Sequence, residues 1–319
     1  IRFYARDQYG YANKIDHPIF PTSSRTDFDV LIIRNSGSDN YPGGSIVYGR
    51  PTCHLRDGYI QSLADKHQLN VDTRKYQPCI VYLNGQYWGI YEMRERIDAD
   101  YTDYYYGQEE KWVDMLEYWG GLDVRYGDPL ATDWNNLYNY MTSNNLANAA
   151  AYNTVLNEID EMSFLDYFIV NTHIVNTDWL NWNTKWWRGI DSPSPTGWRY
   201  TFWDMDNVFN LGQNYTGMGS TTYLNDPCDP QTLFSNDPDV PHMDMINALF
   251  ANPTFYDLYI NRYADLLNTT LNCDTMLTHF DVMIAALTPE MPRQIAKWGG
   301  SMTDWNANVQ LLRAEIEGR

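Results

Sequence analysis

The sequence has few cysteines and no long apolar run, and both absences restrict the kind of protein it encodes. No stretch of about 18 consecutive apolar residues occurs, so no segment is expected to span a bilayer as a helix. The four cysteines, Cys53, Cys79, Cys228 and Cys273, lack the C-x-x-C spacing of a zinc knuckle or a thioredoxin-type site. Two disulfides and four buried thiols both remain compatible with this spacing.

Basic residues are also scarce. The 319 residues include 22 Lys and Arg against 41 Asp and Glu, a formal net charge of -19. Proteins that bind nucleic acid concentrate Lys and Arg to meet the phosphate backbone, so we expect no nucleic-acid partner. Apolar residues make up 44% of the chain and aromatic residues 15%, which is enough for a substantial core in one large domain or in two lobes.

Several weaker features favour an exported protein. The cysteine usage and a composition rich in polar and aromatic residues are typical of secretion. N-x-T triplets, which accept N-linked glycans in exported proteins, start at Asn214 and Asn268. The first residue, Ile1, already lies in a strand-like segment, so we expect a signal peptide to lie upstream. We therefore predict a secreted, extracellular or cell-surface location and leave the oligomeric state open.

Residues 1–97 carry mostly strand signals and are predicted to form one domain. Residues 29–34, Asp-Val-Leu-Ile-Ile-Arg, are typical of a buried strand, and residues 55–67 carry apolar side chains on one helical face. The Asn84-Gly85 pair separates two apolar and aromatic runs, which is the signature of a two-residue β-hairpin. This domain is therefore expected to combine a sheet with one helix.

Residues 98–319 are predicted to form a second, mainly helical domain. Two short segments are exceptions, because the Trp, Tyr and Thr content of residues 184–188 and 198–203 indicates strands. Asp178 would then lie in a loop after a helix, and Asp204 at the end of a strand. The predicted helices cover residues 133–146, 147–158 and 163–175, the last capped by Ser163, and further helices from residue 243 onward that break near 252–253 and 289–292.

The most informative stretch is residues 176–207. Asp178 and Asn183 have the D-x-x-x-x-N spacing of a protein-kinase catalytic loop, and Asp204 follows where a kinase keeps its metal-binding Asp. In that chemistry Asp178 would orient the acceptor hydroxyl and take its proton, while Asn183 and Asp204 would supply oxygen ligands to a divalent metal. Asp206 would lie on the same face as Asp204 in an extended backbone, and is a candidate second ligand.

Each part of this motif also has an ordinary structural interpretation. The D-x-x-x-x-N pattern alone is common, and an Asp at the start of a loop is more often a turn or cap residue. Acidic residues directly after the aromatic strand at 200–203 are harder to explain in this way, because a carboxylate beside buried apolar residues needs a partner such as a cation. Asn181 competes with Asn183 as a ligand, although its spacing fits less well, and His173 is interpreted as a core histidine.

Four segments, in the same order, resemble the spore-coat protein H (CotH) kinase family, an atypical branch of the protein-kinase-like fold. They cover much of the chain, while the helical remainder after Met243 adds no motif. The four are residues 31–39, similar to the family's L-x-x-R-N-x-G-x-D segment; residues 54–59, similar to the Arg-bearing start of its N-lobe helix; residues 83–98, similar to its NGxYWGxYxxxExxD hairpin; and residues 176–183 with 203–206, similar to its catalytic loop and W-D-x-D element.

The resemblance implies an α+β, two-lobed protein-kinase-like fold with a strand-rich N-lobe and a mainly helical C-lobe. It also implies that the protein uses ATP and Mg²⁺ or Mn²⁺, with Ca²⁺ as an alternative, to phosphorylate Ser or Thr on secreted or spore-surface proteins. By motif, Asp178 is the catalytic Asp, and Asn183 and Asp204 bind the nucleotide and its metal. Glu95 belongs to an N-lobe site for metal or phosphate, and Arg34 lies near the phosphates.

Two of these assignments have competing structural interpretations. Arg34 could simply pair with Asp39, and Glu95 with Arg94 or Arg96 on a solvated face. The sequence also departs from an ordinary protein kinase, because it has no G-x-G-x-x-G loop and no V-A-I-K strand. The predicted N-lobe also has few lysines near its strands. Two alternatives stay open: a lysine that contacts phosphate lies just upstream of Ile1, or it is absent, which would weaken or redirect catalysis.

Three further functions remain open on the sequence. Kinase-like folds also transfer other groups from ATP, such as AMP. A pseudokinase or adhesin would use the many Trp and Tyr side chains as a binding face. A carbohydrate-processing enzyme would use a pair of carboxylates such as Glu92 and Glu95, but these two would face opposite sides of an extended strand.

Overall fold

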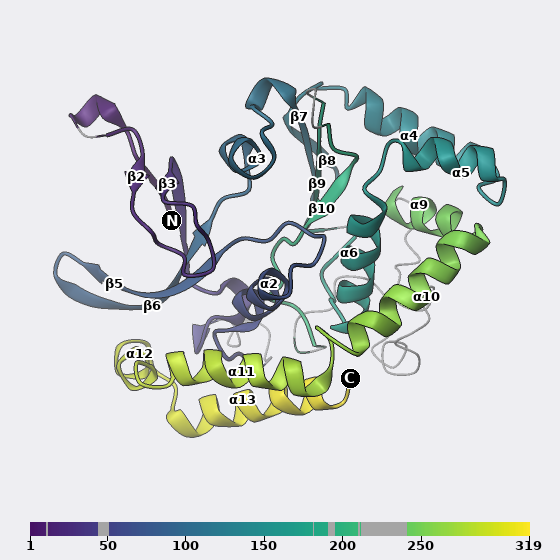
Figure 1. Ribbon diagram of the computed structural model, residues 1–319. Helices are drawn as coiled ribbons and strands as arrows, with labels where there is room; N and C mark the ends of the chain where they lie inside the picture. The colour runs from purple at the N-terminus through teal and green to yellow at the C-terminus, as the bar shows by residue number, and fades with distance from the viewer. Residues whose placement is uncertain (11, 44–50, 181, 191–194, 210, 212–240) are drawn as a thin grey trace.

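The computed structural model describes the chain except for residues 11, 44–50, 181, 191–194, 210 and 212–240. It is 45% helical and 19% strand, which confirms the α+β class. Two four-stranded sheets lie in different parts of the molecule and are accompanied by helices (Figure 1). No helix in the described ranges is long and apolar enough to cross a membrane.

The first sheet is antiparallel and has the strand order β1-β4-β6-β5. Its strands are β1 (Arg2–Tyr4), β4 (Val30–Arg34), β5 (Tyr76–Leu83) and β6 (Gln86–Glu95). The predicted hairpin is confirmed, since Asn84 and Gly85 join β5 to β6 with φ of 50° and 75°. Both residues are in the left-handed region, which Asn and Gly adopt at least cost in such turns.

The second sheet has the order β10-β9-β7-β8 and is also antiparallel. The two strands predicted here are confirmed as β9 (Thr184–Gly189) and β10 (Arg199–Thr201). Sequence patterns missed the hairpin of β7 (Val113–Tyr118) and β8 (Leu122–Tyr126), which completes this sheet. A separate two-stranded ribbon pairs β2 (Ile15–Asp16) with β3 (Asp27–Phe28).

The predicted helices are confirmed with small changes at their ends. In Figure 1, α11 and α13 lie side by side, and α2 packs against α11. The breaks expected at the prolines separate α9 from α10 and α11 from α12. The α-helices are α2 (Arg56–Lys66), α3 (Ala99–Tyr106), α4 (Thr132–Ser143), α5 (Ala149–Leu156), α6 (Glu161–His173), α9 (Pro241–Phe250), α10 (Pro253–Leu267), α11 (Cys273–Leu287), α12 (Met291–Trp298) and α13 (Met302–Glu317).

The predicted cap of α6 was wrong. Asp160, not Ser163, is the N-cap residue, and its carboxylate accepts a hydrogen bond of 3.0 Å from the Ser163 backbone N–H. The Ser163 hydroxyl instead accepts the backbone N–H of Tyr200 at 2.9 Å. An Asp in this position satisfies a free helix N–H, while the serine joins α6 to β10.

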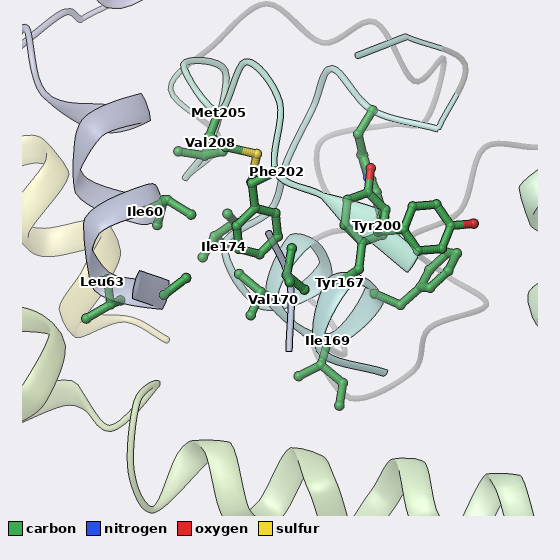
Figure 2. Packing of buried hydrophobic residues seen from close by; sticks show 14 of the residues in the cluster. Ile60, Leu63, Tyr167, Ile169, Val170, Ile174, Tyr200, Phe202, Met205 and Val208 are labelled. Carbon is green, nitrogen blue, oxygen red and sulfur yellow. The ribbon is translucent and has the colours of Figure 1, made fainter. Parts of the chain in front are cut away.

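The main core joins α2 and α6 through the segment after β10 (Figure 2). Ile60 and Leu63 of α2 and Val170 of α6 are buried in the same cluster as Phe202 and Met205. Tyr167 and Tyr200 stack with their ring centroids 4.2 Å apart. Because Phe202 and Met205 are anchored in this core, the acidic residues between and beside them have a defined position.

The structure also tests the predictions for the cysteines and for His173. Cys53, Cys79 and Cys273 are free thiols, buried, half-buried and exposed respectively, so neither two disulfides nor four buried thiols describes them; Cys228 lies outside the described residues. His173 is buried as expected, with Nδ1 3.3 Å from the Tyr263 hydroxyl.

Candidate functional site

The loop after α6 places Asp178 against the segment that follows β10. The Asn207 side-chain amide donates to Asp178 Oδ2 at 2.9 Å. The backbone N–H and the hydroxyl of Thr177 both donate to the Asn207 carbonyl at 2.9 Å. Asn176 Oδ1 accepts the Asp178 backbone N–H at 3.0 Å. Two segments about 30 residues apart in sequence are thus held together around one carboxylate.

Asn183 closes the same loop. Its side-chain Nδ2 donates to the backbone carbonyl of Asp178 at 3.3 Å, so the predicted D-x-x-x-x-N pair is in direct contact. Leu180 and Asn183 have φ of 68° and 52°, a conformation uncommon for residues other than glycine. The competing candidate, Asn181, lies outside the described residues. Strained backbone of this kind often occurs at functional sites, but here the contact itself is the stronger observation.

Asp204 and Asp206 both contact Arg34. Arg34 Nη2 donates to Asp204 Oδ1 and, at 2.5 Å, to Asp206 Oδ2. The expectation of an extended backbone was wrong, because Asp204 has φ of 52°. The two carboxylates nevertheless converge, since the bend at Asp204 and the cation between them bring them together. The Ser38 backbone N–H also donates to Asp206 Oδ2 at 2.7 Å.

Gly37 is the residue that lets the two segments approach so closely. A Cβ built at Gly37 would overlap Asp206 Oδ2 and Arg34 Nη2. Its φ of +57° is also in the left-handed region, which glycine adopts without strain. The glycine of the predicted L-x-x-R-N-x-G-x-D segment therefore has two physical reasons to be there.

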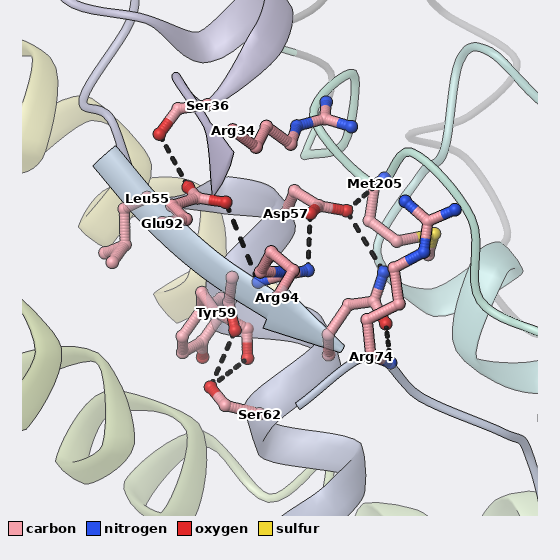
Figure 3. A network of polar contacts seen from close by, with 12 residues as sticks. Arg34, Ser36, Leu55, Asp57, Tyr59, Ser62, Arg74, Glu92, Arg94 and Met205 are labelled. Atoms are coloured by element: carbon pink, nitrogen blue, oxygen red, sulfur yellow. Dashed lines mark hydrogen bonds and ion pairs between the residues drawn. The ribbon is translucent and has the colours of Figure 1, made fainter. Parts of the chain in front are cut away.

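A second network of buried charged groups contacts the segment that carries Asp204 and Asp206 (Figure 3). Asp57, in the first turn of α2, accepts Arg94 Nη2 at 2.5 Å and the backbone N–H of Met205 at 2.8 Å. Glu92 accepts the Ser36 hydroxyl at 2.6 Å. Helix α2, strand β6 and the segment carrying Asp204 and Asp206 are therefore connected through charged groups.

Burial sets the pKa values of the acids in this region. Burial raises the pKa of Asp178 to about 6, with Asp204 adding to the effect and the Asn207 hydrogen bond opposing it. Burial also raises the pKa of Asp206 well above its ordinary value, again with help from Asp204 and against Arg34. For Asp57, burial is outweighed by the neighbouring arginines, above all Arg94, and the pKa is well below the ordinary value.

The structure also locates the alternative partners of Arg34 and Glu95. Asp39 pairs with Arg56, with Arg56 Nε 3.1 Å from Asp39 Oδ1, so it does not pair with Arg34 as the simpler interpretation held.

Glu95 pairs with Arg25 at 2.9 Å and accepts the Tyr105 hydroxyl at 3.2 Å, rather than pairing with Arg94 or Arg96. These contacts place it apart from the Arg34 cluster. Glu92 has its own partners, so the two glutamates do not form one carboxylate pair.

Two adjacent cavities lie beside this cluster. The smaller one, of about 370 Å³, is lined by Asn183 and Asp204 among other residues. The larger one, of about 470 Å³, is lined by residues that follow β6 and by side chains of both four-stranded sheets. They share Glu117, Arg125 and Trp203 as lining residues, so they are adjacent. Together they offer a polar site that borders two of the predicted ligands.

The oxygen donors at this site fit a Mg²⁺-type ion whose coordination shell is completed by a bound ligand. In the described part of the chain, no three His, Cys, Asp or Glu side chains gather as a metal site on their own. Asn183 and Asp204 nonetheless border one cavity, and the buried Asp206 Oδ1 has no hydrogen-bond partner among the described residues. Mg²⁺ is usually bound by one or two carboxylates, with phosphates and water completing its shell. This donor set therefore suits a metal that arrives with a phosphorylated ligand.

Several residues at the site were not identified from sequence. Asn207 directly follows the W-D-x-D element, and Asp57 lies in the helix start that carries family resemblance, so both had a local signal. Arg74 and Lys185 had none. They contact the Trp203 ring from 4.7 Å and 4.6 Å, and only the folded chain shows that they meet there.

A comparison with protein-family models gives one match over most of the chain. The model described as CotH kinase protein matches residues 52–319, which include Asp57, Asp178, Asn183, Asp204 and Asp206. The segment around Arg34 lies before the matched range. No curated protein in the comparison matches the chain. The chain belongs to the CotH kinase family.

Proposed function

We propose that the protein is an ATP- and divalent-metal-dependent protein kinase that phosphorylates Ser or Thr on secreted or cell-surface proteins. The observation that carries the proposal is the junction of the loop at Asp178 and Asn183 with the segment at Asp204, beside a cavity that Asn183 and Asp204 line. Membership of a kinase family supports the reaction class. ATP, the metal, the protein substrate and its extracellular location are parts of the proposal.

A two-lobed kinase-like arrangement is part of the same proposal. The first sheet and α2 would form the N-lobe and the remainder the C-lobe, divided near residue 97. Arg34 on β4 and Asp57 on the following helix, α2, would both belong to this N-lobe. Here Arg34 contacts Asp204 and Asp206, so it organises the acidic pair.

Asp178 is proposed to act on the acceptor hydroxyl. Because burial raises its pKa only to about 6, the carboxylate is mostly ionised at neutral pH. It can hydrogen-bond the hydroxyl and take its proton as the hydroxyl oxygen bonds to the γ-phosphorus. The bond from that phosphorus to the β,γ-bridging oxygen breaks, and ADP leaves. Asn207 keeps the carboxylate in position during this step.

A metal ion would be held by Asn183 and Asp204, with Asp206 as a further donor. When bound, such an ion neutralises phosphate charge. Arg34 now contacts both aspartates, so it would share or exchange these carboxylates with the ion.

The test is transfer of label from ATP to a generic protein acceptor with Mg²⁺ or Mn²⁺. Label from the γ position, and none from the α position, is expected; Asp178→Asn should lower the rate by at least about 100-fold while ATP still binds. Label from the α position would instead indicate nucleotide transfer. If neither label is transferred and calorimetry detects no ATP binding, a pseudokinase scaffold becomes the better explanation.

The pH dependence provides a second check on Asp178. The group must be ionised to accept a proton, so transfer by the wild-type protein should fall as the pH decreases through about 6. Acceptor phosphorylation at saturating ATP is measured from pH 5 to pH 8. A flat profile over this range would contradict the assigned role.

A further inference from the structure

Arg74 differs from the other buried arginines. Arg25, Arg56 and Arg94 each form an ion pair with a carboxylate, at 2.9 Å, 3.1 Å and 2.5 Å. Arg74 is only 8% exposed, yet in the described part of the chain no carboxylate lies within ion-pair distance of it. Its buried Nε has no hydrogen-bond partner among the residues that the structure describes. A buried cation without a partner is unfavourable and calls for an anion.

The fold holds Arg74 firmly in place. The Gln61 side chain of α2 accepts its backbone N–H at 2.7 Å. Two residues earlier, Asp72 exchanges backbone hydrogen bonds with the segment at Tyr200 and Phe202, at 3.2 Å and 2.9 Å. This pairing sets Arg74 beside Trp203, the residue before Asp204. Arg74 is therefore positioned by α2 and by the segment at residues 200–203, and is not a mobile surface side chain.

Burial makes the position of Arg74 unfavourable to a cation. Burial lowers its pKa to about 10, and Arg34 and Arg94 add to that effect against Asp57 and Asp204. The guanidinium stays charged at neutral pH, but the folded protein stabilises it less than water does. An anion at this place would offset both the burial and the repulsion between the arginines.

Arg74 lines the 470 Å³ cavity, which is basic although the protein is strongly acidic. Lys185 lies in the same cavity, with Nζ 2.9 Å from both Glu117 Oε1 and the Ile97 carbonyl. The cavity adjoins the one that Asn183 and Asp204 line. The basic residues that line it are Arg2, Arg74, Arg96, Arg125 and Lys185, against the acidic residues Asp98 and Glu117.

We propose that Arg74 binds the phosphate chain of the nucleotide, in place of the strand lysine that an ordinary kinase uses. This assignment rests on the proposed function and extends it to the ligand's charged groups. Arg34 does not fill that place, because Asp204 and Asp206 already hold it. Phosphate oxygens accept several hydrogen bonds from one guanidinium, so Arg74 would gain an anionic partner that the described residues do not supply.

Arg74→Met tests the proposal, and Arg188→Met is its matched control. Both arginines stack on a tryptophan, Arg74 on Trp203 at 4.7 Å and Arg188 on Trp198 at 5.0 Å. Arg188, however, pairs with Asp114 at 2.9 Å and does not line the cavity. Calorimetry with ATP and with inorganic tripolyphosphate should show at least tenfold weaker binding to Arg74→Met and unchanged binding to Arg188→Met.

The thermal stability of the ligand-free variants gives a readout that a merely structural residue would not produce. Arg74→Met removes an unpaired buried charge and should raise the melting temperature, whereas Arg188→Met breaks an ion pair and should lower it. Arg74→Lys keeps the charge and should weaken ATP binding less than Arg74→Met does. Near-ultraviolet circular dichroism confirms that each variant is folded, and Arg74→Lys decides the matter if Arg74→Met is not.

The outcomes separate this assignment from the proposed function. Equal ATP binding by the wild type and by Arg74→Met would overturn the role of Arg74 and leave the kinase proposal standing. Binding of tripolyphosphate that depends on Arg74, without ATP-dependent label transfer, would support an anion site and reject the kinase. If the wild type binds neither ATP nor tripolyphosphate, the role of Arg74 is overturned.

Discussion

Several individual residues at this site lower the stability of the folded protein. Asp206 Oδ1 is buried and has no hydrogen-bond partner in the described ranges, and burial raises the pKa of Asp178 to about 6. Asp204 adopts a left-handed backbone that costs a residue with a Cβ some energy. Local rules of protein stability are commonly broken at functional sites, which is consistent with a functional origin for this group.

The prediction at this scale concerns Gly37→Ala. The new Cβ would overlap Asp206 Oδ2 and Arg34 Nη2, and the positive φ would add backbone strain. We expect a loss of about 1 to 3 kcal/mol in the free energy of unfolding from the strain alone, and more if the overlap does not relax. Metal-dependent ATP binding should also weaken, because Asp206 would be displaced.

Gly85→Ala is the matched control for this change. Gly85 also has a positive φ, 75°, but no atom of the described residues lies within 4 Å of a Cβ built there. It should lose stability through strain alone and keep its ATP affinity. Urea unfolding and calorimetry measure the two effects. Equal ATP affinities in the two variants would show that the close approach at Gly37 is not needed.

At the scale of elements, the site depends on how α2, β6 and the segment after β10 are joined. Asp57 of α2 accepts Arg94 of β6 and the backbone N–H of Met205. Figure 3 shows the three segments meeting at this carboxylate. Because all these charged groups are buried, removing one partner of an ion pair leaves the other as an uncompensated buried charge.

Asp57→Asn tests this connection. We expect a loss of about 3 to 5 kcal/mol in the free energy of unfolding, since Arg94 would remain as a buried charge with only Glu92 nearby, at 3.7 Å. Asp65→Asn, on the same helix, is the control. Asp65 pairs with Lys75 in a less buried position and should cost less. A loss at Asp57 no greater than at Asp65 would contradict the role of the network.

The depressed pKa of Asp57 also predicts how the free energy of unfolding depends on pH. Burial raises the pKa of Asp57, but the neighbouring arginines, Arg94 above all, have the larger effect. The pKa is therefore well below the ordinary value of 3.8. A depressed pKa means that the stabilisation is present above the unfolded pKa and is lost as the pH falls below about 4. Urea unfolding between pH 6 and pH 2 should show a shallower loss in Asp57→Asn than in the wild type.

For the whole molecule, the important feature is a cavity that borders both four-stranded sheets. Ile32 of the first sheet and Lys185 of the second both line it. A ligand there would contact parts of the protein that are far apart in sequence, and it would stabilise the folded state as a whole. The acidic net charge of -19 makes this basic cavity stand out as the place for an anion.

The prediction at this scale is stabilisation by ATP and Mg²⁺ together. ATP at about 100 times its dissociation constant should add about 2.7 kcal/mol to the free energy of unfolding. Asp204→Asn should lose the part that depends on Mg²⁺. The control is Asp281→Asn, whose exposed carboxylate pairs with Arg313 away from the cavities. Thermal unfolding with and without Mg²⁺ measures this, and equal Mg²⁺ effects in the two variants would contradict metal binding by Asp204.

Much of the local structure could be predicted because short-range physics determines it. The Asn84-Gly85 turn, α2, and strands β9 and β10 all follow from turn chemistry and hydrophobic periodicity. The hairpin of β7 and β8 could not, because sequence patterns in the surrounding region indicated helices. The Ser163 cap failed for a different reason, since a better cap, Asp160, lies three residues earlier.

The family, the α+β class and the D-x-x-x-x-N and W-D-x-D motifs could be identified before folding is considered, because they depend on residue type and spacing along the chain. Which charges form pairs is known only from the folded chain. Arg34 meets Asp204 170 positions away, Glu95 meets Arg25, and no carboxylate of the described residues pairs with Arg74. Pairing over such distances depends on burial and packing of distant elements, and no local pattern encodes it.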